Sequence, residues 1–114
     1  MNGVWESFLS AAQTLSSAGP IKPRLTSAYS VYLATLQTEE LPREVRDEFK
    51  ELGSCMCSVM PMRGESAIQA SVRKMSEDEA AGYALRIINL LAAISKIQMQ
   101  PRQPVLRAVN ASDA

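Results

Sequence analysis

The sequence contains no histidine. Without an imidazole, serine–histidine and cysteine–histidine nucleophilic catalysis are excluded, and so are zinc or iron sites built on histidine ligands. The five glycines are scattered and form no phosphate-binding loop. Most carboxylates fall at predicted helix starts or in the charged stretch 39–51, where capping and solvation account for them. We therefore predict that the protein is not an enzyme, has no catalytic residues and binds no cofactor.

The sequence also lacks an excess of charge of either sign, because 12 basic residues balance 12 acidic ones. A neutral chain has no global field to attract nucleic acid or an anionic membrane. The longest apolar run, within 84–94, is interrupted by Arg86 and Asn89 and is too short to span a bilayer. The first residues lack the basic region of a secretory signal. We expect a cytoplasmic protein with no membrane partner.

Only two cysteines are present, Cys55 and Cys57, which is too few for a disulfide framework. With three methionines they give the segment 55–62 five sulfur atoms, and soft sulfur ligands suit copper(I) or redox chemistry. On a helix, however, the two thiols would point about 200° apart. Core methionines and buried thiols are the preferred interpretation. The two cysteines remain weak metal candidates, and we predict no metal site.

What the sequence does contain is apolar residues at helical spacing. Hydrophobic residues make up 46% of the chain and aromatics 5%, which predicts a folded domain with a mainly aliphatic core. Ser66 with Gln69, and Ser76 with Glu79, have the spacing of helix-capping boxes. Helices are predicted over roughly 3–17, 21–37, 42–60, 66–74 and 76–98, with an extended segment as the alternative for 66–74.

The predicted fold is all-α, a small helical bundle of three long helices plus one shorter helix. Residues 1–100 should form a single helical domain, followed by a flexible C-terminal tail over 101–114. Within that tail, the apolar stretch 105–109 could order on contact with a partner. The helix after Ser76 is apolar on two sides, so we expect it at the centre of the bundle, between neighbours.

By elimination, we predict a small non-catalytic protein that acts through protein–protein interaction or self-association, with a homodimer as one form. Apolar surface left over by the bundle would be the interface. Leu85, Ile88 and Ala92 form one candidate patch, and Trp5 with Phe8 forms another. Packing of Trp5 and Phe8 inside the bundle is the competing interpretation.

One alternative is a nucleic-acid-binding or regulatory protein that uses the basic residues Arg63, Arg73 and Lys74, with Arg86 as a further member. No aromatic side chain for base stacking lies in that stretch, and charge pairing at helix ends explains the same residues. A second alternative is the soft-metal or redox protein based on the segment 55–62. An enzyme would need a pocket, and Tyr29, Tyr32 and Tyr83 are the polar aromatics that could line one.

Overall fold

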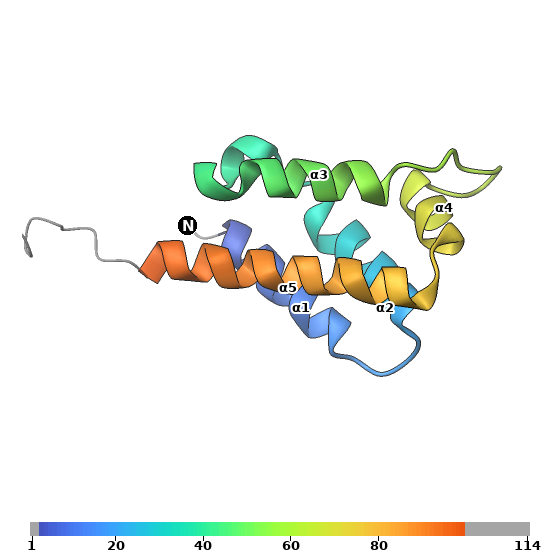
Figure 1. The fold of residues 1–114 in the computed structure, drawn as a ribbon, viewed down its shortest axis with the longest axis horizontal. Helices are drawn as coiled ribbons and strands as arrows, with labels where there is room; N and C mark the ends of the chain where they lie inside the picture. The colour runs from blue at the N-terminus through green and yellow to red at the C-terminus, as the bar shows by residue number, and fades with distance from the viewer. Residues whose placement is uncertain (1–2, 100–114) are drawn as a thin grey trace, which may run out of the picture.

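The computed structural model describes residues 3–99, and within this range the chain is helical and contains no strand (Figure 1). The all-α prediction is confirmed. The predicted tail at 101–114, with its 105–109 stretch, lies outside the described residues. The helices are α1 (Gly3–Leu15), α2 (Ile21–Ala28), α3 (Arg46–Met56), α4 (Ala67–Lys74) and α5 (Glu77–Met99). Each of the five predicted ranges corresponds to one α-helix, but α2 and α4 both have only eight residues, whereas only the helix over 66–74 was predicted to be short.

Both predicted capping boxes are present. The Ser66 hydroxyl accepts a hydrogen bond from the backbone N–H of Gln69 at 3.0 Å, and the Gln69 side chain accepts from the Ser66 N–H at 2.8 Å. Ser76 and Glu79 make the same reciprocal pair at 3.0 and 2.8 Å. These bonds satisfy N–H groups that a helix start leaves unpaired. The extended alternative for 66–74 was wrong.

The predicted helix 21–37 is divided and shorter. After α2 the chain forms a π-helical turn, η1 (Tyr29–Leu33), in which the Ala34 N–H donates to the Tyr29 carbonyl at 2.8 Å. Two 3-10 turns follow, η2 (Thr38–Glu40) and η3 (Arg43–Val45), before α3 begins. Pattern analysis assumes 3.6 residues per turn throughout, so it does not detect a turn closed over five residues.

The third predicted helix ends four residues early. The Cys57 N–H bonds to the Gly53 carbonyl at 3.1 Å, and the chain then leaves the helix. Met56 is fully buried, whereas Met60 is 83% exposed, so the prediction that Met60 lies in the core was wrong. The prediction of buried thiols was also wrong, because Cys55 is half-buried and Cys57 is exposed.

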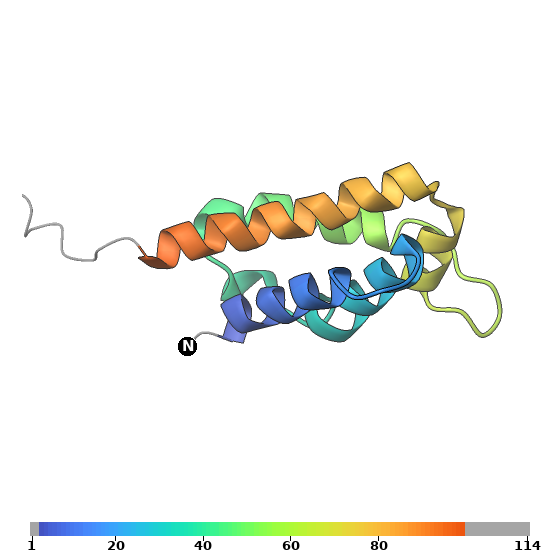
Figure 2. The same ribbon diagram turned by 90° about the horizontal axis from the view of Figure 1, so that it is seen from below.

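The helices form two layers, with α3 and α5 side by side in one and α1 and α2 in the other (Figure 2). α5 contacts α1, α2 and α3, and it runs opposite to α1 and α3 (Figure 1). Phe8 and Phe49 meet edge-on across the core, with ring centroids 6.0 Å apart. The largest other fully buried side chains are Leu25, Leu33, Leu41, Leu52, Met56, Ile87 and Ile94.

Candidate functional site

α5 has one buried side and one exposed side. Its buried residues, Ala80, Ile87, Leu90 and Ile94, share one side of the helix and pack on α1, α2 and α3. The opposite side was expected to be covered by a neighbour, and this was wrong, because no described element covers it. We call this side the outer face of α5; it consists of the exposed residues Ala81, Gly82, Leu85, Ile88, Asn89 and Ala92.

The outer face is uncharged over about 18 Å of helix, at 1.5 Å per residue. At 100° per residue, its six members lie within an arc of about 120° centred on Leu85. Leu85 is 58% exposed and Ile88 is 38% exposed. Asp78 and Lys96 lie at the same helical angle, one turn beyond each end. An exposed apolar surface with a charged rim is typical of a site that binds another macromolecule.

Polar contacts fasten the two edges of α5 to its neighbours. On one edge the Arg86 guanidinium lies 3.4 Å from carboxylate oxygens of both Glu48 and Glu51 in α3. On the other edge the indole N–H of Trp5 donates to the Ser95 hydroxyl at 2.8 Å, which ties α1 to the end of α5. Because these contacts and the buried side hold α5 in place, the fold does not use the outer face.

The structure separates the predicted interaction residues into accessible and inaccessible ones. Leu85, Ile88 and Ala92 lie exposed on the outer face. Phe8 is fully buried against Phe49, and Trp5 is half-buried and bonded to Ser95. The alternative patch formed by Trp5 and Phe8 was therefore wrong, because these side chains belong to the interior packing.

The sequence interpretation missed Ala81, Gly82 and Asn89, which lie on the same face as the predicted residues, and the boundary charges Asp78 and Lys96. A signal for all five was present, because they lie within about 60° of Leu85 around the helix axis. It was overlooked because polar and small residues do not add to an apolar pattern.

The basic residues do not form a free cluster of positive charge. The Arg73 guanidinium bonds both oxygens of Glu65, at 2.7 and 3.1 Å. This pairing, with a further hydrogen bond from the Met62 N–H, lowers the pKa of Glu65 to about 2. Arg86 is paired with α3, and Arg63 lies exposed in the turn before α4. Two of the four side chains are thus already matched by carboxylates of this chain.

Cys55 lies in a depression of about 200 Å³ between α3, α4 and α5, whose lining also includes Ser71, Lys74, Glu79 and Tyr83. A hydrogen bond with the Cys55 thiol, together with burial, raises the pKa of the Tyr83 hydroxyl. Cys57 does not line this depression. Among residues 3–99, no three acidic or cysteine side chains are grouped closely enough to hold a metal ion.

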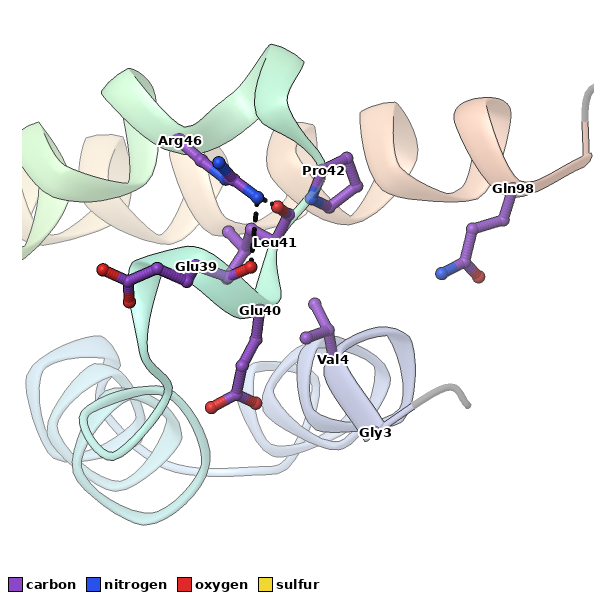
Figure 3. A pocket seen from close by; sticks show the side chains of 8 residues that line it. All are labelled: Gly3, Val4, Glu39, Glu40, Leu41, Pro42, Arg46 and Gln98. Atoms are coloured by element: carbon purple, nitrogen blue, oxygen red, sulfur yellow. Dashed lines mark hydrogen bonds between the residues drawn. The ribbon is translucent and has the colours of Figure 1, made fainter.

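A cavity of about 670 Å³ lies where the start of α1, the turn η2 and the end of α5 meet (Figure 3). Arg46 donates to the carbonyls of Leu41 and Glu39, at 2.8 and 3.1 Å. The Glu40 carboxylate accepts from the Gln37 N–H at 3.1 Å. In Figure 3 the carboxylate of Glu39 points away from Gln98 on the far wall. The charged groups here hold the turn in place, and they give no indication of acid–base chemistry.

α5 is the one helix within residues 3–99 whose length and composition would let it cross a membrane. The apolar run within 84–94, on which the sequence-based prediction rested, is shorter than this helix, so a helix of spanning length was not predicted. It has 23 residues, and only 22% of its most apolar 18-residue window is buried. The core helix of a protein in water meets the same criterion. Its first turn carries Glu77, Asp78 and Glu79, and Arg86 is ion-paired to α3.

A scan against protein-family models found no match to this chain. Searches of curated proteins and of solved structures also found none. The outer face of α5 is the surface from which a function can be proposed.

Proposed function

We propose that this protein is non-catalytic and acts by binding another protein molecule through the outer face of α5. The observation that carries the proposal is the exposure of Leu85 and Ile88 in the middle of an uncharged surface that nothing in the described fold covers. Full burial of a leucine or isoleucine side chain contributes roughly 1.5–3 kcal/mol. Covering what remains exposed of these two would therefore contribute on the order of 2 kcal/mol to binding, before the alanines are counted.

A protein surface fits this face better than a lipid surface does. Helices that lie on anionic membranes are rich in lysine and arginine along their polar edges. Here one end of the outer face carries Asp78 beside Glu77 and Glu79, and among the described residues Lys96 is the single basic residue at the other end. The charge at the rim is thus of both signs, as in a surface that meets complementary charges on a partner.

The proposal is tested with a photo-crosslinking amino acid placed at position 85 in the cell that makes the protein. The matched control carries the same group at Gln13, an exposed residue on α1 in the other layer. We expect position 85 to form a protein adduct and Gln13 to form none. The adduct mass then identifies the class of partner, since a second copy would give twice the chain mass of 12.5 kDa.

Lipid adducts alone at position 85 would contradict the proposal in favour of a membrane partner. Equal labelling from positions 85 and 13, or no adduct from either, would also contradict it, because the outer face would then be no more engaged than ordinary surface.

A further inference from the structure

We infer that the outer face of α5 binds a second copy of this chain, with the two α5 helices packed antiparallel. The inference rests on the proposed function and names the partner of that same face. It follows from the spacing of the apolar residues and from the charges at the ends of the face, and the area available sets the expected strength.

The apolar residues of the outer face follow the spacing of paired helices. Ala81, Leu85, Ile88 and Ala92 are separated by steps of four, three and four. Steps that alternate between three and four keep these side chains on one side of the helix, along the line of contact, or seam, with a second helix. The next position in the series, Ser95, is already bonded to Trp5, so the seam ends there. Two large residues at the centre with an alanine on each side give a face that a second helix can approach closely.

Antiparallel packing pairs unlike residues across the seam. When Leu85 lies beside Ile88 of the second copy, Ala81 falls beside Ala92 by the regular rise of the helix. The same register brings Asp78 next to Lys96 of the second copy. The twofold axis repeats each contact, so two opposite-charge pairs close the two ends of the interface.

Parallel packing is disfavoured by the same charges. It would place Glu77, Asp78 and Glu79 of one copy beside those of the other, six carboxylates at one end. Like charges held together oppose association, and the two helix dipoles would also point the same way. The antiparallel arrangement instead brings each acidic N-terminus to the C-terminal half of its partner.

The size of the face predicts a weak dimer. The interface, including the flanking charges Asp78 and Lys96, is about 28 Å long, and a helix pair is about 10 Å across, which gives roughly 300 Å² per copy. Stable complexes bury about 800 Å² per partner. We therefore expect a reversible dimer with a dissociation constant on the order of 10–100 μM.

Sedimentation equilibrium of the full chain, from about 10 to 500 μM, measures this constant. Asp78→Lys and Lys96→Asp should each weaken the dimer about five- to tenfold, because each creates like-charge contacts at both ends. The double variant D78K/K96D should restore the constant to within about twofold. The controls are Glu6→Lys, also in the first turn of its helix, and Lys50→Asp, exposed on α3; neither should change it.

Orientation is read out by cysteine pairing in a chain with Cys55→Ser and Cys57→Ser. Separately tagged copies carrying Ala81→Cys and Ala92→Cys are mixed and oxidised. Antiparallel packing yields the mixed disulfide between the two variants, whereas parallel packing yields each variant bonded to itself. Self-bonded products would overturn the antiparallel assignment, as would a double charge variant that stays as weak as the single ones.

Failure of self-association is distinguishable from failure of the proposed function. If the natural chain stays monomeric at 500 μM, the inference of self-association is wrong. If position 85 still forms an adduct with a different protein in the cell, the proposed function stands and only the identity of the partner is wrong.

Discussion

The hydroxyl of Tyr29 lies against Gly53, where a β-carbon on residue 53 would be only 3.1 Å from the phenol oxygen. Tyr29 opens the π-helical turn η1 and is almost fully buried, and Gly53 is inside α3. A glycine within a helix costs about 1 kcal/mol relative to alanine. The close approach of the tyrosine explains why that residue is a glycine.

Gly53→Ala should therefore have opposite effects in two backgrounds. In the natural chain, the crowding of the buried phenol outweighs the gain in helix propensity, and stability should fall by about 1 kcal/mol. In the Tyr29→Phe background the oxygen is gone, and Gly53→Ala should raise stability by about 0.5–1 kcal/mol. Urea denaturation of the four proteins measures the coupling. The same change in both backgrounds would show that the contact does not restrict residue 53.

Tyr29 should also make the protein sensitive to alkali. Burial, and to a lesser extent the nearby Cys57 thiol, raises the pKa of Tyr29 from 10.0 to about 12. Because the folded pKa lies above the unfolded one, this contribution is fully present below pH 10 and is lost as pH rises toward 12. Tyr29→Phe should flatten the fall in stability between pH 9 and 12, followed by urea denaturation. Tyr32→Phe, which leaves Tyr29 in place, should keep the fall.

The Glu65–Arg73 ion pair should affect the stability of the protein at acidic pH. The Arg73 guanidinium, and then the Met62 N–H, lowers the pKa of Glu65 from 4.5 to about 2. A depressed folded pKa contributes stability that is present above pH 4.5 and is lost as pH falls toward 2. Arg73→Gln should raise the pKa of Glu65, measured by NMR titration of its side-chain carboxyl carbon. The neighbouring Lys74→Gln is the control, and a normal Glu65 titration in the natural chain would refute the pairing.

Substitutions of two adjacent isoleucines should distinguish a residue needed for folding from one on the proposed binding surface. Ile87 is fully buried and Ile88 is 38% exposed on the outer face. Ile87→Ala should lower the free energy of unfolding by about 2–5 kcal/mol, because it leaves a cavity in the core. Ile88→Ala, measured at low micromolar concentration where the chain is monomeric, should lower it by about 1 kcal/mol or less. Similar losses at both positions would show that the outer face is covered in solution.

The bond between Trp5 and Ser95 gives a spectroscopic test of how α1 meets α5. Trp5 is the single tryptophan of the chain. Ser95→Ala should leave its indole N–H without the 2.8 Å partner, shift the fluorescence and lower stability by about 0.5–1.5 kcal/mol. Ser16→Ala, which removes an exposed hydroxyl after α1, should change neither. An unchanged emission spectrum in Ser95→Ala would contradict the packing.

Structural features that depend on residues close together in the sequence were predictable. Ser66 and Ser76 set the starts of α4 and α5 through residues three positions away, and both were recognised from spacing alone. The end of α3 was misjudged because the apolar period continues to Met60 although the helix stops at Met56. The periodic spacing of apolar residues shows how far a helix could continue, whereas the packing of its last turn determines where it ends.

The sequence does not show which of the two apolar sides of α5 is buried and which is exposed. Positions 87 and 88 are both isoleucine, and each lies on an apolar stripe of the same helix. Only the positions of α1, α2 and α3 determine that Ile87 is buried and Ile88 is not. The cavity between Val4 and Gln98 was likewise beyond prediction, because residues from both ends and from the middle of the described chain form it. Such features depend on contacts between distant parts of the sequence.

The loop over residues 57–66 divides the chain into two structural halves. Before it lie α1, α2 and α3; after it lie α4 and α5, joined to each other through only Met75 and Ser76. Arg63 sits exposed in this loop, so trypsin should nick the native protein there. The severed halves would still share the core, because α5 packs on all three earlier helices. The chain could therefore be divided within this loop, and its halves expressed separately and recombined with a different label on each.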